Sequence, residues 1–147
     1  MAIRENFSYT DMDDWLNAKR VTEIECLVPD LTGVARGKIL PRVKFTEERG
    51  MRLPEAVLGM TVTGNSPTND AAYDKAISST DRDMILKADP TTITMVPWAV
   101  DPTAQVIHDC YFASGELVDF APRSVLRRGW KLYEKKGWKR LVAPAHE

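Results

Sequence analysis

The chain has 147 residues, of which 44% are hydrophobic and 28% charged, and its 20 Lys and Arg against 21 Asp and Glu leave a net charge of -1. This size predicts one globular domain that can bury a core without metal or disulfide cross-links. The balanced charge gives no reason to expect a nucleic-acid or membrane partner. With no signal-like start and no long apolar run, the sequence predicts a cytoplasmic protein.

The first predicted elements are a helix and a β-hairpin. A short amphipathic helix is expected over residues 10–20, with Thr10 as its candidate cap and aspartates in its first turn. Apolar and polar residues then alternate from 21 to 28, which predicts a half-buried strand. Turn-forming residues occupy 29–33, and a second strand follows over 34–40.

Charged residues occupy the polar positions of both hairpin strands. Glu23 and Glu25 lie on the first strand, and Arg36 and Lys38 lie on the second. We expect the two sets to face each other, with each pair worth about 0.2 to 1 kcal/mol.

The middle of the chain has weaker periodicity. One helical turn is predicted over 45–49, and a strand over 56–62, which is β-rich and bounded by Pro54 and Gly64. Residues 64–82 contain many turn formers and little periodicity. A segment of this length without regular structure is usually either functional or disordered, so it is the most interesting loop of the chain.

The last third predicts further strands and one long helix. Apolar character resumes over residues 83–86, strands are expected over 92–98 and 104–111, and a final strand is expected over 140–147. The long helix begins at Pro122 and ends at Gly137, because Pro suits the first helical position and Gly favours the end of a helix. This order of elements predicts an α+β domain with a mixed or antiparallel sheet.

Three features that could carry chemistry have simpler structural interpretations. Residues 33–38 lack the GxxxxGK(S/T) spacing of a phosphate-binding loop and precede no helix. His108 and Asp109 are neighbours in a predicted strand, so they point to opposite faces and form no catalytic dyad. Cys26 and Cys110 lie far apart in apolar runs, which favours reduced thiols in the core.

Five phrases of the chain stand in an order shared with a known family. They cover residues 30–41, 83–86, 89–92, 96–99 and 121–128. In this order they resemble the amino-terminal part of type I glutamine synthetases and of related γ-glutamyl-amine or polyamine ligases. The resemblance runs from Val21 to Glu147 and implies a β-grasp-like fold with a mixed sheet and a long packing helix.

The resemblance also implies how the chain is divided. Residues 1–20 would form an N-terminal helical segment, and residues 21–120 the β-grasp domain of the glutamine synthetase family. Residues 121–147 would supply a helix and the first strand of a catalytic domain that lies beyond this sequence.

Membership of this family implies an ATP-dependent ligase that joins L-glutamate to ammonia or an amine and needs Mg²⁺ or Mn²⁺. Such ligases assemble into homo-oligomeric rings, in which each active site lies between two subunits. Phosphoryl transfer of this kind needs carboxylates that hold divalent cations and basic groups around the phosphates. Most of these groups would belong to the catalytic domain, so the isolated domain is expected to hold no cofactor and to be inactive.

Within the long loop, the resemblance selects Thr63, Gly64, Asn65 and Ser66. This segment would reach into a neighbouring subunit, where glutamine synthetases carry an Asp-Gly-Ser-Ser phrase whose acid helps to bind ammonium. Because Thr63 takes the place of that acid, we expect an amine bulkier than ammonia as the substrate.

The end of the chain resembles a family strand that carries two metal-binding glutamates. Glu147 matches the second glutamate, Ala145 stands in place of the first, and His146 lies between them and should face away. The metal site is therefore expected to be incomplete, which leaves open whether the parent protein is a pseudoenzyme. A free-standing ubiquitin-like interaction module without catalysis is the alternative function.

Overall fold

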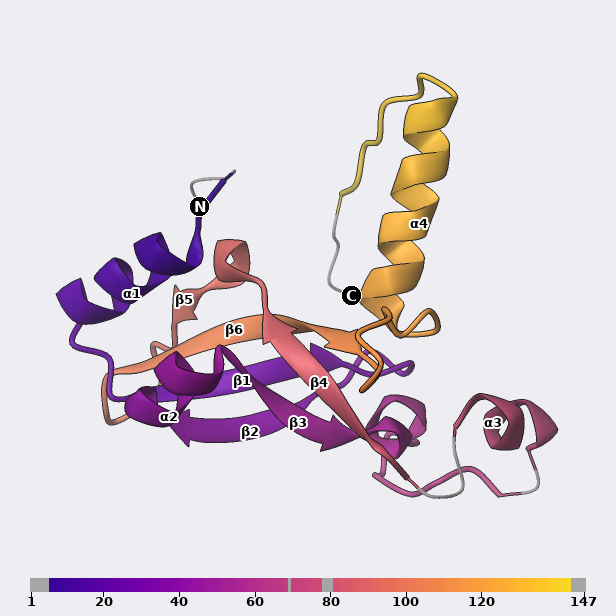
Figure 1. Cartoon of the computed structure of the whole chain (residues 1–147), viewed down its shortest axis with the longest axis horizontal. Coiled ribbons are helices and arrows are strands. Elements are labelled where there is room, and N and C mark those ends of the chain that lie inside the picture. The colour runs from indigo at the N-terminus through magenta and orange to yellow at the C-terminus, as the bar shows by residue number, and fades with distance from the viewer. Residues whose placement is uncertain (1–5, 69, 78–80, 144–147) are drawn as a thin grey trace.

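Figure 1 shows the computed structural model, which describes residues 6–68, 70–77 and 81–143. Its helices are α1 (Tyr9–Ala18), α2 (Arg42–Glu48), α3 (Ala71–Ala76) and α4 (Pro122–Lys135), with short 3-10 helices η1 (Glu55–Gly59) and η2 (Pro90–Thr92). Its strands are β1 (Glu23–Pro29), β2 (Ala35–Pro41), β3 (Gly50–Pro54), β4 (Asp83–Ala88), β5 (Thr94–Met95) and β6 (Thr103–Tyr111). Within the described residues, no helix is long and apolar enough to cross a membrane.

The sheet is mixed, with the strand order β2-β1-β6-β4-β3. Its two central strands, β1 and β6, are parallel, and each has an antiparallel partner on its other side. β3 extends the sheet beyond β4, and the two-residue β5 also pairs with β6. A parallel central pair flanked by antiparallel strands is the β-grasp arrangement, so the predicted α+β fold with a mixed sheet is confirmed.

The core forms where the alternating side chains of the central strands meet residues of the first two helices. Ile24, Cys26 and Val28 are buried on β1, as their alternation predicted. Fully buried residues of α1 and Phe45 of α2 belong to the same cluster. The chain therefore supplies its own core, as its length and composition predicted.

The cap of α1 differs from the predicted one. The Ser8 hydroxyl accepts a hydrogen bond from the Asp11 backbone N–H (3.2 Å), and the Asp11 carboxylate accepts one from the Ser8 backbone N–H (2.8 Å). Thr10 lies inside the helix instead. These two reciprocal hydrogen bonds satisfy two backbone N–H donors at once. Ser8 is therefore the N-terminal cap of α1.

Replacing Ser8 with alanine should lower the free energy of unfolding by about 1 kcal/mol, because one helix donor loses its partner. The matched control is Thr10→Ala, which removes a hydroxyl two residues away without touching the cap. Urea unfolding followed by circular dichroism measures both. Equal losses in the two variants would contradict this assignment of the cap.

The hairpin exists, but the predicted pairing of its charges was wrong. The register places Glu25 opposite Ile39 and Arg36 opposite Val28. Residues directly opposite each other share a face, so Arg36 points to the same side as the buried Val28. It cannot meet the glutamates of β1, and it finds other partners.

The strand predicted over 56–62 was also wrong. The strand of this region is β3, which lies before residues 56–62 in the chain. In β3, Met51 and Leu53 are buried, and Arg52 between them is exposed. Residues 55–59 form η1, in which Glu55 and Leu58 are buried. Burial at a spacing of three residues fits a 3-10 helix rather than a strand, so the apolar content of this run was misleading.

Two further predicted segments are more regular or shorter than expected. The loop over 64–82 contains α3, whose N-terminal N–H groups are capped by the Asp70 carboxylate. The strand predicted over 92–98 is reduced to β5, because η2 includes residue 92 and a turn occupies residues 97–98. The strand over 104–111 is confirmed as β6.

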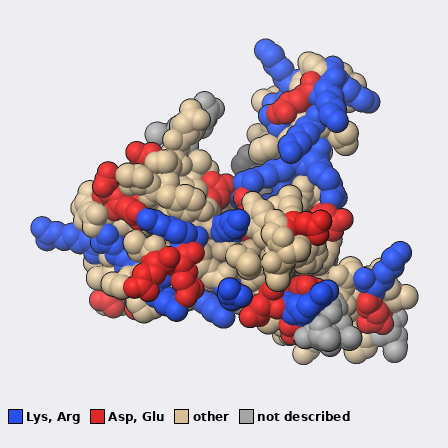
Figure 2. Space-filling model, in the orientation of Figure 1, with Lys and Arg blue, Asp and Glu red and all other residues tan. Residues whose placement is uncertain are grey.

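The long helix α4 begins at Pro122 as predicted, and Gly137 follows its end with a positive φ of 68°. It stands away from the sheet, and Lys and Arg side chains gather over it in Figure 2. Of its residues, only Ser124 is buried, and Trp130 remains 40% exposed. Residues 140–143 form no strand, and the rest of the predicted last strand lies outside the described residues.

Candidate functional site

The four loop residues selected from the sequence belong to a closed turn. The Gly64 N–H donates to the Thr61 carbonyl (2.9 Å), and the Thr61 N–H donates to the Asn65 carbonyl (2.9 Å). The Thr63 hydroxyl lies 3.0 Å from the Thr61 hydroxyl and accepts from the Asn65 side-chain amide (3.2 Å). Gly64 has a φ of 85°, which favours glycine, and Ser66 is exposed. We call residues 61–66 the turn loop.

The turn loop is attached to the hairpin by Arg36. Its Nη2 donates to the Thr61 carbonyl (2.8 Å), and its Nε donates to a carboxylate oxygen of Asp30 (2.8 Å). The side chain of Asp30 is fully buried and also accepts from the backbone N–H groups of Thr32 and Val34 at 2.9 Å each. One carboxylate therefore fixes both the hairpin turn and the arginine that holds the turn loop.

The charge of Asp30 is stabilised in this position. Burial alone would raise the pKa of this carboxyl, but the hydrogen bonds from Arg36, Thr32 and Val34 outweigh burial and hold the pKa below its usual value. Sequence reasoning missed this connection. The available signal was an aspartate two residues before a threonine in a turn, since such an aspartate commonly accepts from the backbone that follows it.

The turn loop offers neutral oxygens and N–H groups rather than charged ones. The exposed Thr63 and Asn65 can donate to or accept from a ligand amine, but no carboxylate is among residues 61–66. Within the described residues, no group of three or more His, Cys, Asp and Glu could hold a metal ion. The predicted metal ligand Glu147, with Ala145 and His146, lies outside the described residues.

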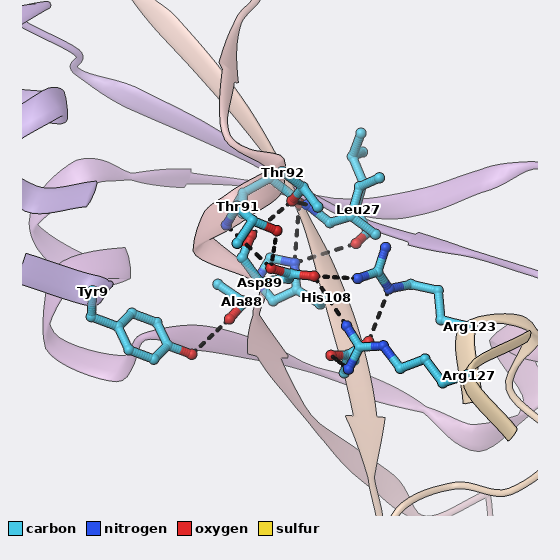
Figure 3. Close-up of polar contacts among 12 residues, drawn as sticks. Tyr9, Leu27, Ala88, Asp89, Thr91, Thr92, His108, Arg123 and Arg127 are labelled. Atoms are coloured by element: carbon cyan, nitrogen blue, oxygen red, sulfur yellow. Dashed lines mark hydrogen bonds and ion pairs between the residues drawn. The ribbon is translucent and has the colours of Figure 1, made fainter. Parts of the chain in front are cut away.

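A second polar cluster attaches α4 to the sheet, as Figure 3 shows. Arg123 contacts Asp89 (2.5 Å) and Asp109 (2.9 Å), and Arg127 contacts the same two carboxylates at 3.1 and 2.7 Å. Burial would raise the pKa of Asp89, but the Thr91 hydrogen bonds and the two arginines bring it below its usual value. Two arginines neutralise two aspartates, so this cluster fixes the start of α4 and leaves no charge free for catalysis.

His108 and the two cysteines are structural, as the sequence predicted. His108 is fully buried, its Nδ1 lies 3.2 Å from the Val106 carbonyl, and its Nε2 has no hydrogen-bond partner among the described residues. Asp109 points to the other face of β6, toward the arginines. Cys26 and Cys110 are buried free thiols, and burial raises the pKa of each to about 12. Such thiols are poor nucleophiles.

Comparison with known proteins relates the chain to one family, although no family model matches it. It is 30% identical over 131 residues to glutamine synthetase of Pyrococcus horikoshii, covering 88% of this chain and 26% of that protein. Most of the chain is therefore similar to part of a glutamine synthetase. Human lengsin (31% over 116 residues) and a glutamate–isopropylamine ligase of a Pseudomonas species (26% over 133 residues) match 78% and 88% of the chain.

Solved structures support the fold of the chain. The ADP complex of GmaS aligns with 86% of the chain at a TM-score of 0.60, and ligand-free GmaS aligns with 88% at 0.62, both at 20% identity. The predicted resemblance to the glutamine synthetase family is confirmed by the sequence relatives. The chain spans about a quarter of the length of the curated relatives that it matches.

Proposed function

We propose that this chain is the amino-terminal domain of an ATP-dependent ligase that joins glutamate to ammonia or an amine in the cytoplasm. The observation that carries the proposal is the match of 88% of the chain to about a quarter of a glutamine synthetase and of a glutamate–isopropylamine ligase. ATP and Mg²⁺ or Mn²⁺ would be held by the part of such a ligase that this chain does not match.

The turn loop is our candidate for the contribution of this domain to an active site. Its shape is fixed before any ligand arrives, because Arg36 and Asp30 hold it through a buried ion pair. A preorganised loop binds a ligand with a smaller loss of conformational entropy. With Thr63 in place of an acid, the loop favours an amine with an apolar body over free ammonium.

The exposed face of α4 supports the proposed contacts between subunits. Val125, Leu126, Trp130 and Tyr133 are each between 40% and 53% exposed, although their spacing places them on one face of the helix. Apolar patches of this kind mark contacts with further protein. Packing against the rest of a ring-forming ligase would cover them.

A chimaera tests the proposal. Residues 6–143 of this chain replace the matched region of the Pseudomonas glutamate–isopropylamine ligase. We expect the purified chimaera to assemble to the size of the host and to release phosphate from ATP only when glutamate and an amine are both present. A chimaera of the host's size that is inactive with ammonia, methylamine and isopropylamine would count against the proposal.

The role of the turn loop is tested in the same chimaera. Thr63→Val together with Asn65→Ala should raise KM for the amine at least about fivefold, about 1 kcal/mol of lost binding, and leave KM for glutamate unchanged. Ser114→Ala, an exposed turn residue, is the matched control. Equal changes in the KM values for glutamate and for the amine would show that these substitutions disturb the whole site rather than the binding of the amine alone.

A further inference from the structure

A basic hollow lies on the outer face of the β3–β4 pair. Its volume is about 440 Å³, and its lining includes Tyr9, Arg49, Gly50, Arg52 and Lys87. Its floor is strand backbone, since Gly50 has no side chain and a Cβ there would lie 1.9 Å from the Leu86 carbonyl oxygen. We call it the β3–β4 hollow.

The register brings two cations together across this hollow. Gly50 pairs with Lys87, and Arg52 pairs with Ile85, so Arg52 and Lys87 are diagonal neighbours on one face of the two strands. Diagonal neighbours on a sheet lie roughly 7–8 Å apart, within reach of long side chains. Because Gly50 carries no side chain, the space between the two cations stays open.

Other charges around the hollow are already compensated. Arg49 pairs with Asp13 (2.5 Å) and lies over the Tyr9 ring, 5.7 Å from its centroid. The Glu48 carboxylate, which also lines the hollow, pairs with Lys44 (2.6 Å).

Neither Arg52 nor Lys87 forms an ion pair in the part of the chain that the structure describes, although the Glu48 carboxylate interacts electrostatically with Arg52. Lys87 instead lies over the Tyr111 ring, 4.5 Å from its centroid. Arg52 and Lys87 both bring positive charge to the lining of the hollow, and like charges on one face repel each other. A dianion between them would remove the repulsion and gain contacts to both.

We propose that the β3–β4 hollow binds a small dianion of the phosphate or dicarboxylate type, with Arg52 and Lys87 as its binding residues. Arginine supplies a planar pair of donors and lysine a point charge, and both suit such oxygens. The proposal does not depend on the ligase activity proposed above, because the binding is measured on the 147-residue chain without any reaction.

The test is a titration of the ¹⁵N-labelled chain with pyrophosphate, and separately with succinate, at constant ionic strength. We expect saturable shifts in the backbone amides of residues 49–52 and 85–87, and the tighter probe identifies the class of anion. Arg52→Gln combined with Lys87→Gln should weaken binding at least about tenfold. Both side chains are exposed, so the double variant should keep its fold, and its spectrum reports this directly.

Arg128→Gln combined with Lys131→Gln, two exposed cations of α4, provides the matched control and should bind as the parent does. Thermal unfolding gives a second measurement, because a ligand that binds only the folded chain raises Tm. Pyrophosphate or succinate should raise Tm in the parent and not in the Arg52 and Lys87 double variant. Shifts that do not saturate, that centre on α4 or that persist in this variant would overturn the proposal.

Discussion

Replacing Asp30 with alanine is expected to lower the free energy of unfolding by about 2 to 4 kcal/mol. The carboxylate is fully buried and accepts from Arg36 and from the backbone of the hairpin turn. Its removal leaves a half-buried guanidinium without its counter-charge and two backbone donors without an acceptor. The loss therefore exceeds that of an ordinary surface ion pair.

Urea unfolding measures this loss, and two variants define its cause. Asp30→Asn keeps an acceptor for the backbone but removes the charge, so it should cost less than alanine. Asp101→Ala removes an exposed carboxylate and should stay within about 0.5 kcal/mol of the parent. Hydrogen exchange at Gly64 should also become faster in Asp30→Ala, because Arg36 no longer holds the turn loop. A variant as stable as the parent would contradict the anchoring role of Asp30.

Acidification from pH 6.5 to 4 is expected to lower the free energy of unfolding by about 3 kcal/mol through His108 alone. Burial lowers the pKa of His108 to about 4, although the Leu27 and Val106 carbonyls oppose this shift. In the unfolded chain the same imidazole titrates near 6.5. Between these two values the unfolded state binds a proton that the folded state does not, so stability falls as the pH falls.

The pH range from 6.5 to 4 distinguishes the effect of His108 on stability from the effects of the buried carboxylates. Asp30 and Asp89 have lowered pKa values, so their contributions are present above about pH 4 and are lost only below it. His108→Phe removes the titrating group beside Phe45 and should flatten the dependence between pH 6.5 and 4. His146→Gln is the matched control for the other histidine. An imidazole of His108 that titrates near 6.5 by NMR would contradict the prediction.

Local patterns of the sequence identified most elements of the fold. The alternation in β1 placed Ile24, Cys26 and Val28 in the core, and Pro122 and Gly137 marked the ends of α4. Where burial did not follow local composition, the predictions were wrong. Residues 56–58 are apolar but lie in the 3-10 helix η1, and the strand lies at Gly50–Pro54. Neighbouring strands decide such cases, because backbone pairing rather than apolar content makes a strand.

Of the candidate site, the sequence identified the turn loop but not what holds it. Thr63 to Ser66 came from resemblance to a family, whereas Arg36 was assigned to glutamates across the hairpin. The register of the hairpin turns Arg36 to the other face and toward Asp30 and Thr61.

The sequence by itself determined the class of fold, the resemblance to the glutamine synthetase family and the structural roles of His108 and both cysteines. These follow from local periodicity and from phrases that keep their order along the chain. Only the tertiary structure decided the attachment of the turn loop, the anchoring of α4 by Asp89 and Asp109, and the diagonal placement of Arg52 and Lys87 on one face of the sheet. Each joins side chains from different strands or helices, and such contacts depend on how segments far apart in the sequence pair and pack, which no single local pattern determines.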